Sequence, residues 1–100
     1  MCGIAGIAVR ENARPDPDQL NAMQFAMAHR GPDGDGMHQV QNVALVHTRL
    51  AIIDTENGQQ PLINQSGTAL IANAEIYNYI ELRANIAAKD LTTGSDCEPL

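Results

Sequence analysis

Hydrophobic residues form a nearly continuous run from Gly3 to Val9, which ends at Arg10. A run without polar alternation is typical of a strand covered on both faces. It is too short for a membrane span, and no basic residue precedes it as a signal peptide requires. We therefore predict a strand that is buried from its first residues.

The next hydrophobic positions follow the period of a helix. Asp16 and Pro17 predict its beginning, because an aspartate accepts from free backbone N–H groups and proline suits the first helical position. Gln19 completes a capping-box pattern. Gly31, as a left-handed cap, and Pro32 predict its end after His29 and Arg30. The apolar face is wide enough to pack on a sheet; it consists of Leu20, Met23 and Met27 with a neighbouring stripe of Ala22, Phe25 and Ala26.

A hairpin is predicted from strands over 37–40 and 43–49, joined by a turn at Gln41-Asn42. Both faces of the second strand carry residues that suit a covered position. One face consists of Val43, Leu45, His47 and Arg49, and the other of Ala44, Val46, Thr48 and Leu50.

The second half of the chain predicts more short elements. Asn57-Gly58 and Ser66-Gly67 are turn signals, and residues 68–72 read as another buried strand. A helix over 77–88 is expected, and residues 92–99 read as a loop that enters a helix. The apolar side of the expected helix consists of Ile76, Ile80, Ala84 and Ala87. Helices and several strands in this order favour an α/β layered sandwich.

A length of 100 residues indicates one small domain or part of a larger one. The residues are 44% hydrophobic but only 3% aromatic, which predicts an aliphatic core. A formal charge of -6 disfavours nucleic acid and anionic membranes as partners. Two cysteines without a secretion signal indicate free thiols and a cytoplasmic location.

Cys2 is the first candidate for chemistry. If Met1 is removed, as the small following side chain favours, the α-amine and the thiol belong to one residue, so a proton acceptor lies beside a nucleophile. The alternative is a thiol packed in the first strand, which is the commoner role of a cysteine at this position.

Six short motifs, taken together, carry more information than Cys2 alone. They are Met1-Cys2-Gly3-Ile4-Ala5-Gly6, His29-Arg30-Gly31-Pro32-Asp33 with Gly36, His47-Thr48-Arg49-Leu50-Ala51-Ile52-Ile53-Asp54, Gln60-Pro61, Asn73-Ala74-Glu75-Ile76-Tyr77-Asn78 and Ser95-Asp96-Cys97-Glu98. In these residues the chain closely resembles the N-terminal glutaminase domain of glutamine-hydrolysing asparagine synthetases. These are class II glutamine amidotransferases and N-terminal-nucleophile hydrolases, so the resemblance implies a layered αββα sandwich of which residues 1–100 are the N-terminal part.

The resemblance implies that Cys2 attacks the side-chain amide of glutamine and forms a glutamyl thioester, while its α-amine moves the proton. The oxyanion donors would be the Asn73 side chain and the Ala74 backbone N–H. Alone, Asn73 would read as a turn residue that caps a strand. The family usually has glycine where this chain has Ala74, and a Cβ there costs about 1 kcal/mol or more if the backbone needs a positive φ.

The resemblance also implies a pocket for the free amino-acid end of glutamine. Arg49 would bind the α-carboxylate, as a planar guanidinium suits, and Glu75 and Asp96 would hold the α-ammonium. Leu50 and Ile52 would line the pocket, partly through backbone groups. The alternatives are ordinary surface ion pairs for the charged residues and core packing for the two aliphatic ones.

No metal is expected, because His29, His38 and His47 lack ligand spacing and the family's glutaminase chemistry needs none. His29 reads as a helix-terminal residue and His47 as a strand residue near Arg49. Residues 30–33 are expected to form an ordered loop that shapes the site, and Cys97 to be a packed thiol.

The family's glutaminase domain and its ATP- and magnesium-using synthetase domain continue beyond such a segment, and no glycine-rich nucleotide loop is present here. We expect partners to be glutamine and the remaining glutaminase or synthetase parts. Unless it pairs with such a part, the segment is expected to expose sheet edges and to be marginally stable or prone to aggregation. The favoured function is glutamine hydrolysis as the glutaminase half of an asparagine synthetase. The alternatives are a disabled glutamine-binding or interaction module, and the glutaminase of a related amide-transfer enzyme.

Overall fold

A three-stranded antiparallel sheet is the centre of the structure. The computed structural model describes all of residues 1–100, and β3 (Val43–Arg49) lies between β1 (Gly3–Ala8) and β2 (Gly34–Val40). In the register, Gly3 faces Thr48 on one side of β3, and Gly34 faces Arg49 on the other. The predicted hairpin is confirmed, with a turn in which Gln41 has a φ of 51° and a first strand that begins three residues earlier than expected.

The predicted burial of the first strand is only partly correct. Gly3 is buried, but exposed and half-buried residues alternate along the rest of β1, and Ile4 is 48% exposed. The cause is the position of β1 at an edge of the sheet, where it pairs with β3 alone and one of its faces is open.

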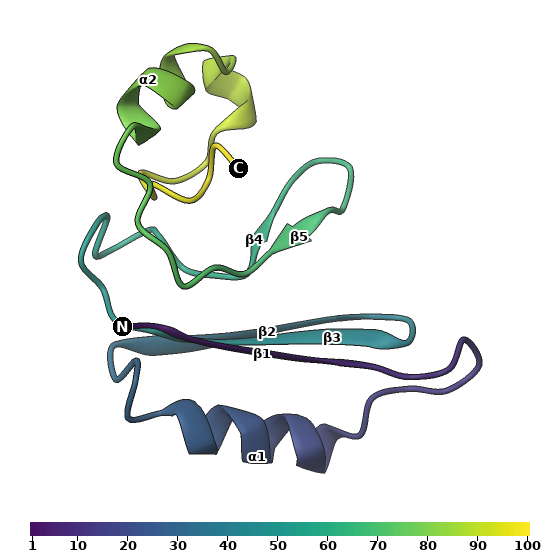
Figure 1. Ribbon diagram of the computed structural model, residues 1–100. Helices are drawn as coiled ribbons and strands as arrows, with labels where there is room; N and C mark the ends of the chain where they lie inside the picture. Colours follow the sequence, from purple (N-terminus) through teal and green to yellow (C-terminus); the bar gives the residue numbers. More distant parts are fainter.

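Helix α1 (Pro17–Met27) covers one face of this sheet (Figure 1). The Asp16 carboxylate accepts from the backbone N–H of Asp18 (3.0 Å), which confirms the predicted cap, whereas the Gln19 side chain makes no hydrogen bond and forms no capping box. Leu20 packs on Ala44 and Val46 of β3. The predicted apolar face is too wide, because the stripe of Ala22, Phe25 and Ala26 faces solvent and Phe25 is 85% exposed.

The end of α1 has a different cap from the one predicted. Ala28 is the C-cap in the right-handed helical region, and Gly31 has no positive φ. Gly31 is required by close approach instead, because a Cβ at this position would lie 2.3 Å from the backbone of Thr48 and Arg49. The glycine therefore lets the loop after α1 press against the end of β3.

The second half of the chain forms smaller elements than predicted. Strands β4 (Leu62–Ile63) and β5 (Ala69–Leu70) make a hairpin whose turn contains Gly67 with a φ of 84°, so the expected strand over 68–72 is shorter. The expected helix over 77–88 is divided into α2 (Tyr79–Ala84) and the 3-10 helix η1 (Ala88–Asp90).

Burial explains why this helix is short. Of the predicted apolar side only Ile76 is half-buried, whereas Ile80 is 65% exposed and Ala84 and Ala87 are exposed. Leu82 and Ile86, which were not predicted to face the core, are half-buried. With no buried residue, α2 gains little from packing. Residues 96–99 form consecutive turns, so the helix expected at Pro99 is absent.

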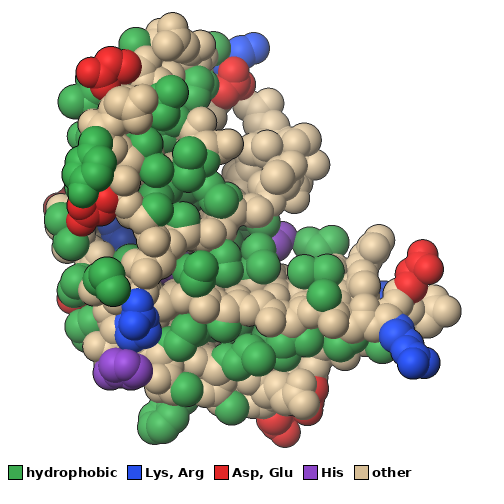
Figure 2. Space-filling view, viewed as in Figure 1, with side chains coloured by type: hydrophobic (Ala, Val, Ile, Leu, Met, Phe, Trp, Pro, Cys, Tyr) green, Lys and Arg blue, Asp and Glu red, His purple; other side chains and the backbone are tan.

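The elements lie in an order that suits an α/β fold (Figure 1): α1, the three-stranded sheet, the β4–β5 hairpin and α2. The hairpin leaves part of the sheet's second face open, and Figure 2 shows hydrophobic side chains at the surface of this hollow. Ile4, Val40 and Val43 are among the exposed hydrophobic residues of the chain. None of the helices is long and apolar enough to cross a membrane.

Candidate active site

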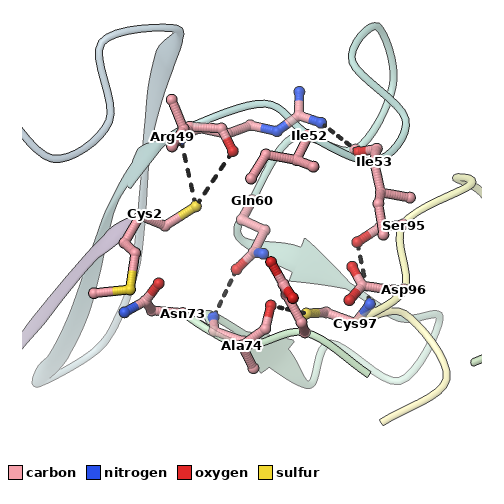
Figure 3. A pocket seen from close by; sticks show the side chains of 15 residues that line it. Cys2, Arg49, Ile52, Ile53, Gln60, Asn73, Ala74, Ser95, Asp96 and Cys97 are labelled. Atoms are coloured by element: carbon pink, nitrogen blue, oxygen red, sulfur yellow. Dashed lines mark hydrogen bonds between the residues drawn. The ribbon is translucent and has the colours of Figure 1, made fainter. Parts of the chain in front are cut away.

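A cavity of about 350 Å³ lies where the ends of β1 and β3 meet the segments 72–75 and 95–97 (Figure 3). All eight residues to which a site role was assigned line this one cavity: Cys2, Arg49, Leu50, Ile52, Asn73, Ala74, Glu75 and Asp96. The fold therefore brings together residues separated by up to 94 positions in the sequence.

The Cys2 thiol is fixed by the backbone of Leu50, just beyond the end of β3. Its Sγ accepts from the Leu50 N–H at 3.4 Å and lies 3.7 Å from the Leu50 carbonyl oxygen, to which the thiol donates. Arg30 donates from Nε to the carbonyl of Cys2 (3.1 Å). Met1 lines the same cavity with an exposed side chain, and Cys2 is half-buried.

The loop of residues 30–33 supports the cavity without lining it. Besides the Arg30 contact, the Asp33 N–H donates to the Arg49 carbonyl (3.0 Å), and the Asp33 carboxylate accepts from the Ala51 N–H (2.9 Å). The loop thus connects the Cys2 segment to the end of β3, in agreement with the predicted role in shaping the site.

Arg49 is almost fully buried, with 4% of its surface exposed. Its guanidinium donates to the carbonyl oxygens of Ile53 (3.1 Å), Thr55 (3.2 Å) and Asp54. Gly58 leaves room for it, since a Cβ there would lie 2.7 Å from Nη2. No carboxylate of the chain pairs with Arg49, so a buried positive charge faces the cavity with only carbonyl oxygens as partners.

Asn73 and Ala74 present free hydrogen-bond donors at the opposite segment. The Asn73 side chain makes no hydrogen bond within the chain, so the alternative of a strand-capping residue is wrong, and the Ala74 N–H has no acceptor. Ala74 does not have a positive φ, so its Cβ causes no left-handed strain. Two unpaired donors beside a thiol can stabilise an oxyanion formed when the thiol attacks a carbonyl carbon.

Two carboxylates complete the polar lining. Asp96 is 7% exposed; its Oδ2 accepts from the Ile76 N–H (2.8 Å), and its Oδ1 accepts from no group in the chain. Glu75 is exposed at the rim and makes no hydrogen bond from its side chain. Since neither these residues nor Arg49 form a salt bridge, the alternative of ordinary surface ion pairs is wrong for all three.

Cys97 is the packed thiol that the sequence predicted. It is buried, and its Sγ donates to the Ala74 carbonyl at 3.8 Å. Desolvation raises the pKa of the Cys97 thiol to about 11, with a further contribution from the neighbouring Asp96 carboxylate. Cys97 therefore stays protonated and is no second nucleophile.

Gln60 is a lining residue whose role the sequence did not reveal. It is buried, and its Oε1 accepts from the Ala72 N–H at 2.6 Å, which connects the segment before β4 to the segment after β5 that carries Asn73. The Gln60-Pro61 motif was visible in the sequence. Nothing in its local pattern, however, predicted that the side chain would cross to a residue twelve positions away.

His29 and His47 differ in burial and in their surroundings. His29 is exposed beyond the end of α1, whereas His47 is fully buried in β3 and neither of its ring nitrogens has a hydrogen-bond partner. Desolvation lowers the pKa of His47, and the nearby Arg49 charge adds to this shift. No three His, Cys, Asp or Glu side chains are grouped as a metal site would require.

Known proteins resemble this chain along its whole length. It is 41% identical to glutamine-hydrolyzing asparagine synthetase 3 of Arabidopsis thaliana and 42% identical to glutamine-hydrolyzing asparagine synthetase of Zea mays, each over 98% of the chain. It is 43% identical to glutamine-hydrolyzing asparagine synthetase 1 of Bacillus subtilis over 100% of the chain. The chain spans 17% of the length of each of these relatives.

A family model described as a glutamine amidotransferase domain matches residues 1–100. The match includes every segment that lines the cavity, from Met1 to Cys97. The chain therefore belongs to the glutamine amidotransferase family.

Proposed function

We propose that this chain hydrolyses glutamine to glutamate and ammonia, with Cys2 as the nucleophile. One observation carries the proposal: the Cys2 thiol shares a cavity with the two unpaired donors at Asn73 and Ala74. A thiol needs such donors to attack an amide, because the attack places negative charge on the carbonyl oxygen.

The reaction begins once Met1 has been removed and the α-amine of Cys2 is free. The amine takes the thiol proton as Sγ bonds to the amide carbon of glutamine, and the oxyanion lies against the Asn73 amide and the Ala74 N–H. The C–N bond then breaks, and the amine returns the proton to the nitrogen, which leaves as ammonia. Water attacks the glutamyl thioester, and glutamate and the thiol are released.

The charged lining matches the other end of the substrate. In this proposal Arg49 binds the α-carboxylate through the N–H groups that its three carbonyl partners leave free. Asp96 and Glu75 hold the α-ammonium, for which the unpaired Oδ1 of Asp96 is suited. Leu50 and Ile52 line the passage between the two ends of the substrate.

The names of the relatives support a wider assignment. We propose that the chain is the N-terminal portion of a type 2 glutamine amidotransferase domain with the αββα sandwich of N-terminal-nucleophile hydrolases, and that it supplies ammonia as the glutaminase half of an asparagine synthetase. In that enzyme the ATP- and magnesium-dependent amidation of aspartate belongs to a synthetase domain, which is a partner of this segment.

The decisive experiment is ammonia release from L-glutamine by the purified chain, Cys2→Ala and Cys2→Ser, with mass spectrometry of the N-terminus. We expect release by the unchanged chain only, from molecules that have lost Met1. Equal release by Cys2→Ala, or activity in molecules that all retain Met1, would contradict the proposal. Calorimetric binding of glutamine without release would instead indicate a glutamine-binding module.

A further inference from the structure

The only salt bridge of the chain lies behind the wall of the cavity that carries Asp96. Arg83 of α2 pairs with Glu98 through Nη1 and Oε2 at 3.3 Å, and neither residue lines the cavity. An exposed pair contributes little to stability, but these side chains are only 24% and 9% exposed.

The Glu98 carboxylate accepts hydrogen bonds from the loop that precedes Asp96. Its Oε1 accepts from the N–H (2.5 Å) and the hydroxyl (2.7 Å) of Thr92, and its Oε2 accepts from the N–H and the hydroxyl of Thr93, both at 2.9 Å. Desolvation opposes ionisation, but these hydrogen bonds outweigh it and lower the pKa of Glu98. The carboxylate is therefore a charged anchor for two consecutive residues.

Arg83 holds the same loop from the other side. It donates from Nη2 to the Thr93 carbonyl (2.7 Å) and from Nη1 to the Ser95 carbonyl (3.3 Å). The Ser95 carbonyl belongs to the peptide unit that leads directly into Asp96. The same carbonyl also accepts from the Glu98 backbone N–H (3.4 Å). The position of this peptide unit thus depends on the turn at Glu98 and on the guanidinium, which the Glu98 carboxylate in turn orients.

Asp96 itself has few other constraints. Only its Oδ2 is anchored within the chain, by the Ile76 N–H, so the direction of Oδ1 into the cavity follows from the backbone on either side. A displacement of about 1 Å is enough to weaken a directed charge contact.

We propose that Arg83 and Glu98 are positioning residues for substrate recognition: together they hold the Ser95–Asp96 backbone so that Asp96 faces the α-ammonium of glutamine. This inference rests on the proposed function. It assigns a role in specificity to an ion pair outside the cavity. It predicts that breaking the pair weakens the preference for substrates that carry an α-ammonium group, while the chemistry at Cys2 is preserved.

The test compares two substrates, L-glutamine and 4-carbamoylbutanoate, which is glutamine without its α-amino group. The readout is the ratio of their kcat/KM values for the unchanged chain, Arg83→Met, Arg83→Lys, Glu98→Gln and Asp96→Asn. We expect Arg83→Met and Glu98→Gln to lower this ratio about tenfold, the effect of losing one well-placed charged hydrogen bond. The lower ratio should arise from a higher KM for glutamine. Asp96→Asn should lower the ratio in the same way.

Arg83→Lys keeps the charge and a donor, and is expected to retain more of the ratio than Arg83→Met. Adding Asp96→Asn to Arg83→Met should cause no further loss, because both changes remove the same contact. The iodoacetamide reaction of Cys2 and the thermal midpoint of each variant identify any variant that does not fold. If Arg83→Met does not fold, the test rests on the kcat/KM ratios of Glu98→Gln and Arg83→Lys, which change the side chain least.

The inference is overturned if both substrates lose activity equally, since the ion pair would then support the fold alone. It is also overturned if Arg83→Met and Asp96→Asn reduce the ratio additively. The absence of any Cys2-dependent ammonia release by the unchanged chain is a different result, because it removes the proposed function rather than the role of the ion pair within it.

Discussion

The sulfur of Cys2 lies between the two backbone groups of Leu50, at 3.4 Å from the nitrogen and 3.7 Å from the oxygen, although the residues are 48 positions apart. The contact follows from the pairing of Gly3 with Thr48, which places the start of β1 beside the end of β3. The Cys2 side chain extends from the start of β1 into the cavity, and Asn73 and Ala74 line another part of the cavity wall (Figure 3).

The two thiols of this cavity should differ sharply in reactivity. With a pKa of about 11, roughly one Cys97 thiol in a thousand is ionised at pH 8, and the side chain is buried. We expect iodoacetamide at pH 8 to modify Cys2 and to leave Cys97 unmodified, as peptide mass spectrometry will show. The control is the same reaction in concentrated urea, where both should react; equal rates in the folded chain would contradict the assignment.

Removing the side-chain oxyanion donor should affect turnover without affecting the fold. Because Asn73 is exposed and makes no hydrogen bond in the chain, Asn73→Ala should leave the thermal midpoint unchanged while it lowers kcat for glutamine by about 10²–10³. Steady-state ammonia release measures this effect. Asn21→Ala, a change at an exposed asparagine of α1, is the matched control. A rise in KM with kcat unchanged at Asn73→Ala would argue against an oxyanion role, because it would show a donor that only binds the substrate.

Local signals predicted the first half of the fold well. Asp16 and Pro17 marked the start of α1, and Gln41-Asn42 marked the β2–β3 turn, because caps and turns depend on residues close in sequence. The face that a helix buries depends on the neighbours it meets instead. Phe25 and Ile80 are exposed for that reason, and their apolar character alone could not reveal it.

The composition of the cavity was predictable only through the ordered set of motifs. Spacing within any one motif could not bring Cys2, Arg49 and Asp96 together, since their proximity arises from strand pairing and from the loop around Arg83. Gln60 and the carbonyl partners of Arg49 escaped prediction because they act through long-range or backbone contacts, which residue identity does not encode.

Gly58 should be needed for the position of the Arg49 guanidinium. A Cβ would lie 2.7 Å from Nη2 and 3.0 Å from the Asp54 carbonyl oxygen, so Gly58→Ala must displace the guanidinium or the turn. We expect KM for glutamine to rise about tenfold or more, with a loss of about 1–3 kcal/mol in the free energy of unfolding.

Gly34→Ala is a matched control, because Gly34 faces Arg49 in the sheet but its added Cβ would meet only the flexible Gln59 side chain, at 3.3 Å. Ammonia release at several glutamine concentrations gives KM for both variants. The same KM in both would show that Arg49 does not depend on the space at Gly58.

His47 should make the fold sensitive to mild acid. Burial lowers its folded pKa below the unfolded value of about 6.5, so the unfolded chain binds more protons as the pH falls. The stability that His47 contributes as a neutral residue is thus fully present above pH 6.5 and is lost below it, by at most about 1.4 kcal/mol per pH unit for one proton. Urea unfolding at pH 7.5 and 5.5 should show this decrease.

The chosen pH range separates His47 from the carboxylates. Asp54 and Glu98 have folded pKa values below their ordinary ones, so the stability that they contribute is lost only as the pH falls below about 4.5. His47→Leu should remove most of the difference between pH 7.5 and 5.5, whereas His29→Gln, at an exposed histidine, should leave it unchanged. An undiminished difference in His47→Leu would mean that another group titrates in this range.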